Sequence, residues 1–234
     1  MPELPEVETI RRQLAPKLID AAIVDAGAHW SAKFTPALDA VGTEIVGTRR
    51  RGKYLLFDLD PGADGGPPRE LVVHLGMTGR LAVHEPGSAL ALHDPATDPH
   101  LRAWWRLDDD RVLTFHDIRR FGRIYVVDSG DYRDIPTLHA LGPEPWDPDF
   151  NGKHLAAFVK RSDRHLKTIL LAQRAVAGVG NIYADEALWD ARINPATRRL
   201  SRQRADELVT AIRQALESGL AHGGTTLRDY VDSD

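Results

Sequence analysis

Tyr54-Leu55-Leu56-Phe57-Asp58-Leu59 decides how this chain folds, because it is a short apolar run with the length and composition of a buried strand. Three further runs of the same kind follow it, and segments rich in glycine, proline and aspartate separate them. These runs are Leu71–Leu75, Arg111–Phe115 and Arg123–Val127. Repeated short strands with turn residues between them predict a β-sandwich in the first half of the chain.

The segments on either side of these strands have helical patterns. The spacing of Val7, Ile10 and Leu14 predicts an N-terminal helix, with Pro5 in its first turn. After the proline-rich segment 142–148, the strand patterns stop and apolar residues recur at helical spacing. We therefore predict an α+β fold, an N-terminal β-sandwich domain with flanking helices joined to an all-α domain. The predicted boundaries are 1–132 for the first domain, 133–150 for a linker and 151–234 for the second domain.

Composition excludes several classes of function. The 234 residues contain no cysteine, which excludes a disulfide scaffold, a zinc site with cysteine ligands, an iron–sulfur cluster and a thiol nucleophile. The ten histidines show no metal-ligand spacing, so no metal site and no cofactor is expected in this chain. The N-terminus has no apolar signal region, and no apolar run approaches the roughly 18 residues of a membrane span. We expect a soluble, cytoplasmic protein with no membrane partner.

Charge is distributed unevenly along the chain, whose formal net charge is −4. Residues 1–150 hold 17 lysines and arginines against 24 aspartates and glutamates, whereas residues 151–234 hold 13 against 10. Binding to a polyanion depends on where charges face rather than on their total. The net charge therefore does not exclude a nucleic-acid partner.

Pro2 is the most informative single residue if Met1 is removed, because its ring nitrogen then becomes the terminal secondary amine. A terminal amine has a larger unprotonated fraction at neutral pH than a lysine side chain. Its attack on a sugar aldehyde carbon gives an iminium, a covalent intermediate of the Schiff-base type. Glu3 and Glu6 can supply a general acid and a charge partner beside it.

The opening residues Pro2–Thr9 resemble the N-terminus of the formamidopyrimidine-DNA glycosylase family, bifunctional enzymes that excise oxidised purines. Four further segments resemble that family in the same order along the chain. They are Arg50–Leu55, His74–Arg80, Asp117–Gly122 and Val179–Leu188, the last being the helix–two-turn–helix signature. Ile118 replaces the proline that the family has in the third of these segments.

The resemblance implies a catalytic role for four residues. Pro2 is the expected nucleophile at the sugar C1′, and Glu3 is expected to assist protonation as the sugar ring opens. Lys53 is expected to reach the lesion nucleotide or its phosphate. Glu6 is expected to support the site, although it can equally serve as a helix-dipole partner. Elimination of both flanking phosphates (β,δ-elimination) would follow base release.

The resemblance also implies a set of DNA contacts. An enzyme that acts on a base inside a duplex must extrude it and fill the gap, and Met77, Arg119 and Phe121 are the expected wedge. The glycines before Asn181 let the backbone approach a phosphate, and the following helix start offers N–H groups. Asn181 itself can cap this helix or bind the phosphate. The full expected set is Met77, His100, Arg119, Arg120, Phe121, Lys167, Gly180 and Asn181, with Thr225 and Thr226 in a loop over the lesion base.

Members of this family usually continue into a zinc finger held by four cysteines, which would supply one structural Zn²⁺ and further phosphate contacts. This chain has no cysteine, so we expect weak duplex binding and poor incision. The leading interpretation is a monomeric DNA glycosylase and AP lyase for 8-oxoguanine and formamidopyrimidines, acting in bacterial base excision repair at the nucleoid. Two alternatives stay open: an endonuclease VIII-like enzyme for oxidised pyrimidines, and a catalytically silent remnant that binds abasic sites.

Overall fold

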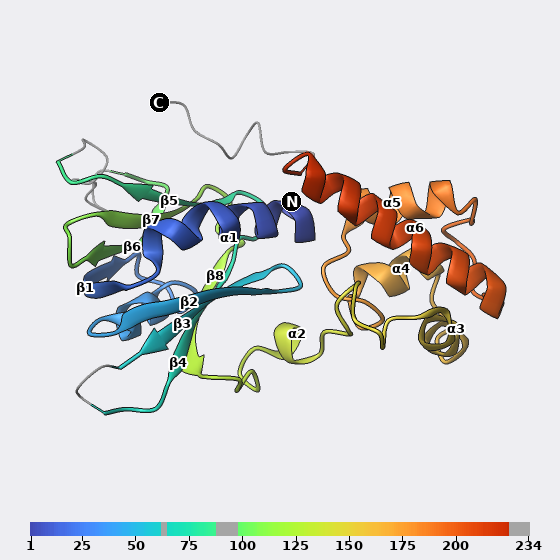
Figure 1. Cartoon of the computed structure of the whole chain (residues 1–234), viewed down its shortest axis with the longest axis horizontal. Helices are drawn as coiled ribbons and strands as arrows, with labels where there is room; N and C mark the ends of the chain where they lie inside the picture. Colours follow the sequence, from blue (N-terminus) through green and yellow to red (C-terminus); the bar gives the residue numbers. More distant parts are fainter. Residues whose placement is uncertain (62–64, 88–97, 225–234) are drawn as a thin grey trace. The chain divides into compact units, whose positions relative to one another are not determined.

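The structure is a computed structural model that describes residues 1–61, 65–87 and 98–224 (Figure 1). The described chain forms two compact units. The sheet unit comprises Met1–Pro2, Ile10–Arg50 and Tyr54–Asp134. The helical unit comprises Glu3–Thr9, Arg51–Lys53 and Ile135–Asp234. The helical unit therefore includes two short segments from the N-terminal half, and both contain predicted catalytic residues.

The sheet unit is built on antiparallel strands whose order across the sheet, within the described residues, is β5-β7-β6-β1-β2-β3-β4-β8 (Figure 1). Each of the four apolar runs identified in the sequence lies largely within a strand. Tyr54–Leu59 and Leu71–Leu75 are buried along almost their whole length, whereas only Ile124 is buried in Arg123–Val127. The strands are β1 (Ala21–Ala28), β2 (Glu44–Arg51), β3 (Tyr54–Asp60), β4 (Arg69–His74), β5 (Gly79–His84), β6 (Leu101–Leu107), β7 (Val112–Asp117) and β8 (Arg123–Asp128).

Strand β1 connects the two halves of this sheet. Its first two residues, Ala21 and Ala22, pair with β2, whereas the rest of the strand pairs with β6. The short 3-10 helix η1 (Thr35–Ala40) packs against β1 and also against β8, which lies at the outer end of the strand order. The sheet must therefore curve around a common interior. The largest apolar side chains buried there are Trp105, Phe34, Phe57 and Phe115.

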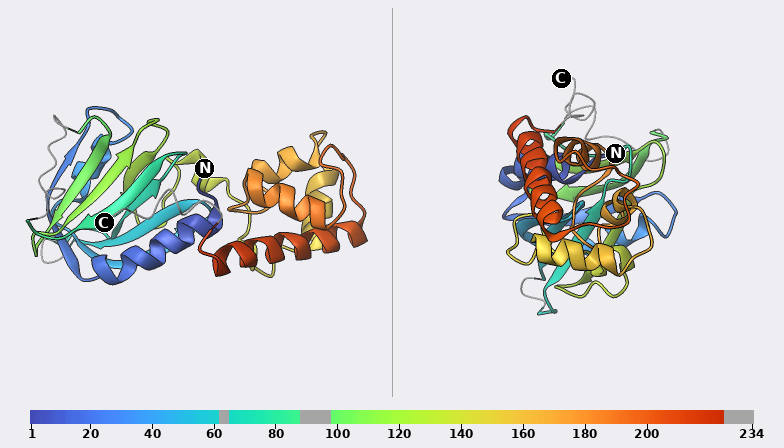
Figure 2. Two further views of the ribbon diagram at one scale, coloured as in Figure 1. Left: turned by 90° about the horizontal axis from the view of Figure 1, so that it is seen from above. Right: turned by 90° about the vertical axis from the view of Figure 1, so that its right-hand side faces the viewer.

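The helical unit has its own apolar core. Asn151 and Ser201 cap α3 and α6 by accepting hydrogen bonds from the amides of His154 and Arg204, respectively. Helix α6 packs against both α3 and α5 (Figure 2). The helices of this unit are α2 (Pro136–His139), α3 (Gly152–Lys160), α4 (Leu166–Leu171), α5 (Asn181–Asp190) and α6 (Arg202–Ala221).

Helix α1 (Leu4–Leu18) carries the N-terminal segment through both units, since its residues up to Thr9 belong to the helical unit and those from Ile10 to the sheet unit. The spacing of Val7, Ile10 and Leu14 predicted this helix. In the structure these three residues and Leu4 are all buried. The predicted α+β class is confirmed by the β-rich first half and helical second half. In the described part of the chain, no helix is long and apolar enough to cross a membrane.

Candidate functional site

The Glu3 carboxylate lies at the N-terminus of α5, in the helical unit. Its Oε2 accepts a hydrogen bond from the Gly180 amide at 2.6 Å, and its Oε1 accepts one from the Ile182 amide at 2.8 Å. A carboxylate at this end of a helix satisfies amides that have no partner within the helix and is favoured by the helix dipole. Glu3 thus caps α5 from a position far away in the sequence.

Lys53 reaches the same point from the turn between β2 and β3. A Cβ built on Gly180 would lie 2.4 Å from both the Lys53 Nζ and the Glu3 Cδ. Both side chains are almost fully buried, Lys53 being 3% and Glu3 2% exposed. A side chain at position 180 would have to displace the ends of Glu3 and Lys53, so glycine lets the two approach each other here.

Burial shifts the proton affinities of this pair in opposite directions. Loss of hydration raises the pKa of Glu3 above its ordinary value, and the opposing effects of Lys53 and the α5 amides are smaller. Loss of hydration likewise lowers the pKa of Lys53, although Glu3 and Glu6 oppose that change. A carboxyl that keeps its proton to higher pH beside a lysine that loses its proton more readily is a combination suited to acid–base chemistry.

Glu6, in the first turn of α1, holds the segment that carries Glu3. Its Oε2 accepts a hydrogen bond from the Glu3 backbone amide at 2.9 Å, and its Oε1 accepts one from the Tyr183 hydroxyl, also at 2.9 Å. Glu6 is completely buried and Tyr183 is 1% exposed. Glu6 therefore fixes the backbone of Glu3, the residue that directly follows Pro2. Pro2 is itself buried.

The sequence predicts no role for Tyr183, although the residue lies within the segment Val179–Leu188 that carries the family resemblance. A Cβ on Gly219 of α6 would come within 2.4 Å of the Tyr183 hydroxyl oxygen. A buried tyrosine hydroxyl normally has a hydrogen-bond partner. Only the tertiary structure identifies that partner as Glu6.

The start of α5 is less open to a ligand than the sequence predicted. Gly180 occupies the N-cap position, and the amides of Gly180 and Ile182 already donate to Glu3. The expectation that this helix start offers free N–H groups is therefore wrong for those two amides. Asn181 is exposed on the first turn, and Lys167 forms an ion pair with Asp185 of α5 at 2.7 Å.

The predicted wedge residues lie on two loops of the sheet unit. Met77 is on the loop between β4 and β5, and its side chain is 36% exposed. Arg119 and Phe121 are on the loop between β7 and β8, where the Arg119 guanidinium carbon lies 5.0 Å from the centre of the Phe121 ring. Phe121 is 50% exposed, which is unusual for a large apolar side chain next to a buried strand.

Two further predicted DNA contacts lie in this sheet unit. Arg120 has a left-handed backbone with φ of 56°, and its carbonyl accepts a hydrogen bond from the Lys33 Nζ at 2.9 Å. His100 is exposed; its amide donates to Asp98, and its carbonyl accepts from the Asp117 amide. Thr225 and Thr226 lie outside the described residues.

No group of three or more histidine, aspartate and glutamate side chains in the described ranges is arranged to hold a metal ion. The zinc finger that the family resemblance implies requires four cysteines, and the chain has none. The residues of this chain therefore do not fit that metal site.

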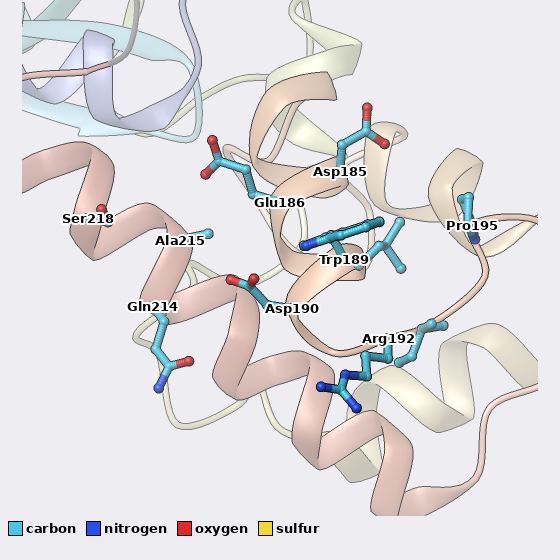
Figure 3. Close-up of a pocket in the computed structure, with 11 residues that line it drawn as sticks. Asp185, Glu186, Trp189, Asp190, Arg192, Pro195, Gln214, Ala215 and Ser218 are labelled. Atoms are coloured by element: carbon cyan, nitrogen blue, oxygen red, sulfur yellow. The ribbon is translucent and has the colours of Figure 1, made fainter.

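A cavity of about 1250 Å³ lies elsewhere in the helical unit, between α5 and α6 (Figure 3). Trp189, which is 82% exposed, lies against it, and Glu186 and Asp190 project from α5 beside it. Burial, together with the negative charges of Asp190 and Glu6, raises the pKa of Glu186. None of the predicted site residues that the structure describes lines this cavity, and its carboxylates would repel a phosphate backbone.

Comparison with protein families gives two matches that together cover most of the chain. Residues 1–124 match the formamidopyrimidine-DNA glycosylase N-terminal domain, and residues 141–231 match the formamidopyrimidine-DNA glycosylase H2TH domain. The formamidopyrimidine-DNA glycosylase of Deinococcus radiodurans is 41% identical over 238 residues, an alignment that covers 99% of this chain and 79% of the relative.

Solved structures give the same result. The crystal structure of the MutM (Fpg) protein from Thermus thermophilus aligns with a TM-score of 0.84 at 43% identity, covering 98% of this chain and 80% of that one. The Lactococcus lactis formamidopyrimidine-DNA glycosylase bound to DNA containing an abasic site aligns with a TM-score of 0.81 at 30% identity, covering 97% and 84% of the two chains.

Proposed function

The chain belongs to the formamidopyrimidine-DNA glycosylase family, and from this we propose that it excises oxidised purines, 8-oxoguanine and formamidopyrimidines, from duplex DNA and then cleaves the resulting abasic site. The observation that carries this proposal is the buried Glu3–Lys53 pair at the start of α5. Glu3 directly follows Pro2 in the chain. A structure of the Lactococcus lactis relative with DNA containing Fapy-dG supports the substrate class.

The proposed reaction begins with the Pro2 nitrogen, which is an amine only after Met1 has been removed. Its lone pair forms a bond to the sugar C1′ while the bond from C1′ to the damaged base breaks, and the base leaves with the proton that the Pro2 nitrogen gives up. Glu3, whose pKa is raised by burial, donates a proton to the ring oxygen as the sugar opens to an iminium. Loss of a C2′ proton then expels the 3′ phosphate, and a second elimination expels the 5′ phosphate.

The other residues bind and orient the DNA in this proposal. Lys53 provides a cation for the lesion nucleotide, and Glu6 with Tyr183 holds the segment that carries the nucleophile. Met77, Arg119 and Phe121 fill the space of the extruded nucleotide. The phosphate contacts are assigned to His100, Arg120, Lys167 and Asn181, and the lesion-base contacts to Thr225 and Thr226. Gly180 is not among them, because its amide already donates to Glu3.

The chemistry uses only groups of this chain and requires no cofactor. We propose that the chain acts as a monomer on double-stranded DNA, in base excision repair at the bacterial nucleoid.

Borohydride trapping tests this proposal, because reduction of the iminium leaves the protein covalently attached to DNA. The protein is incubated with duplexes that contain 8-oxoguanine, dihydrothymine or an abasic site. We expect adducts with the 8-oxoguanine and abasic duplexes, in a preparation whose intact mass shows that Met1 has been removed. An adduct with dihydrothymine but not with 8-oxoguanine would indicate an endonuclease VIII-like specificity. Absence of an adduct even with the abasic duplex would indicate a silent DNA-binding protein.

A further inference from the structure

The geometry points to Asp117 as the positioning residue that joins the two loops of the proposed DNA wedge, an inference that rests on the proposed function. Asp117 is the last residue of β7 and is completely buried, so its carboxylate requires internal partners. The loops that carry Met77, Arg119 and Phe121 supply the hydrogen bonds to this carboxylate. Arg102, near the start of β6, binds the Asp117 carbonyl.

Both oxygens of the carboxylate bind the loop between β7 and β8. Oδ1 accepts a hydrogen bond from the Arg119 amide at 3.2 Å, and Oδ2 accepts one from the Gly122 amide at 2.7 Å. These two amides stand at opposite ends of the three residues Arg119–Phe121. The carboxylate thus closes the loop at its base and fixes the direction in which Arg119 and Phe121 leave the sheet.

The same carboxylate binds the loop between β4 and β5. Oδ1 accepts a hydrogen bond from the Thr78 hydroxyl at 2.5 Å, and the Thr78 oxygen in turn accepts one from the Arg119 amide at 3.1 Å. Thr78 follows Met77 directly. One buried charge therefore sets the separation between the loop of Met77 and the loop of Phe121.

Backbone packing holds the two loops together at a second point. Gly76 has a φ of 65°, and a Cβ there would lie 2.6 Å from the Gly122 nitrogen. The guanidinium of buried Arg102 also donates from Nε to the Asp117 carbonyl at 2.8 Å. The loops form one rigid support, which keeps apolar and flat side chains exposed at their tips without collapse onto the sheet.

A wedge matters most when a base must leave the duplex, because unstacking that base costs free energy. An abasic site has no base to unstack, so most of this cost is absent there. Loss of the Asp117 contacts should therefore slow base excision more than strand cleavage at an abasic site. Thr78→Val removes the hydroxyl that links the loops, and Asp117→Asn removes one acceptor and the charge. Thr78→Ser keeps the hydroxyl, and Thr114→Val removes a buried hydroxyl from the same strand as Asp117 but away from the loops.

The test measures single-turnover cleavage of an 8-oxoguanine duplex and of an abasic-site duplex, with 2-aminopurine beside the lesion to report unstacking. Thr78→Val and Asp117→Asn should slow 8-oxoguanine excision and the 2-aminopurine signal by about tenfold, the effect of losing one hydrogen bond to a charged group. Their abasic-site cleavage should stay within about twofold of wild type. Thr78→Ser and Thr114→Val should behave as wild type on both duplexes.

Equal losses on both duplexes, or none on either, would overturn the role of Asp117 while leaving the proposed function intact. A wild-type protein that cleaves neither duplex would overturn the proposed function and this inference together. Thermal unfolding of each variant identifies a general loss of stability, and Thr78→Val, whose side chain is only partly buried, keeps the comparison decisive if Asp117→Asn fails to fold.

Discussion

Glu3 lies where opposing influences act on its proton. Burial raises its pKa, whereas Lys53 and the amides at the start of α5 lower it, and burial has the largest effect. The acid form therefore persists to higher pH than in an exposed glutamate. A group that must donate a proton to an opening sugar ring near neutral pH requires this shift.

Replacing Glu3 by glutamine removes the transferable proton. We expect Glu3→Gln to slow adduct formation with an abasic-site duplex roughly 100-fold or more, the usual contribution of a general acid. Glu207→Gln makes the same chemical change at a partly exposed residue of α6 that pairs with Arg204, and it should have no effect on trapping. In wild type the trapping rate should decline as pH rises through the raised pKa of Glu3, and Glu3→Gln should lack this decline. Wild-type rates in Glu3→Gln would show that another group supplies the proton.

Tyr183→Phe removes the hydroxyl that donates to buried Glu6. The free energy of unfolding should fall by about 1–3 kcal/mol, because the carboxylate loses a partner where water cannot replace it. Urea unfolding measures this change, with Tyr125→Phe on β8 as the control. The rate of borohydride trapping should also fall, while affinity for an abasic-site duplex stays the same. A weaker affinity with an unchanged trapping rate would contradict the positioning role.

At the scale of elements, we expect the candidate site to be most sensitive to substitution at the start of α5. Gly180→Ala would place a methyl group 2.4 Å from both the Glu3 carboxyl carbon and the Lys53 Nζ. We expect adduct formation to be lost and the melting temperature to fall. Gly66→Ala, where the nearest atom is a proline carbon at 3.5 Å, should change neither. Full trapping activity in Gly180→Ala would mean that the two side chains need not meet at α5.

Strand β4 contributes a second buried carboxylate, which stabilises the sheet unit. Glu70, 1% exposed, accepts hydrogen bonds from Arg49, from the Ser129 hydroxyl and from the Tyr132 hydroxyl, and so ties β4 to the chain after β8. Burial and the Glu70 charge raise the pKa of Tyr132 from 10.0 to about 12.

This shift predicts how stability depends on alkaline pH. Because the folded pKa of Tyr132 is raised, its stabilising contribution is complete below pH 10 and is lost as pH rises towards 12. The stability difference between wild type and Tyr132→Phe should therefore shrink across this interval when both are unfolded in urea at successive pH values. A difference that is constant from pH 9 to about pH 12 would contradict the contact.

At the scale of the whole molecule, the elements could be predicted from sequence because their signals are local. Apolar runs such as Leu71–Leu75 become strands since both faces are buried, and the spacing of Leu208, Ile212 and Leu216 gives the buried stripe of α6. The Ser201 cap could be predicted for the same reason. The family resemblance selected Glu3, Glu6 and Lys53, and the structure brings these three residues together.

The remaining features of the site depend on contacts between distant segments. Glu3 and Gly180 are 177 positions apart, so no local pattern could show that a carboxylate occupies the amides of α5. Tyr183 and Asp117 also lay in recognised motifs, but their roles depend on partners in other elements, Glu6 for the first and Thr78 for the second. The residue types are visible in the sequence. The buried hydrogen bonds that position these residues can be identified only in the folded chain.

The group that we propose attacks DNA is the Pro2 amine, supported by Glu3 and Glu6. The most direct measurement is mass spectrometry of trypsin-digested protein after borohydride trapping on an abasic-site duplex. We predict that the reduced sugar adduct is carried by the peptide of residues 2–11, on the Pro2 nitrogen, with Met1 absent. An adduct on Lys53, or on any other peptide, would contradict it.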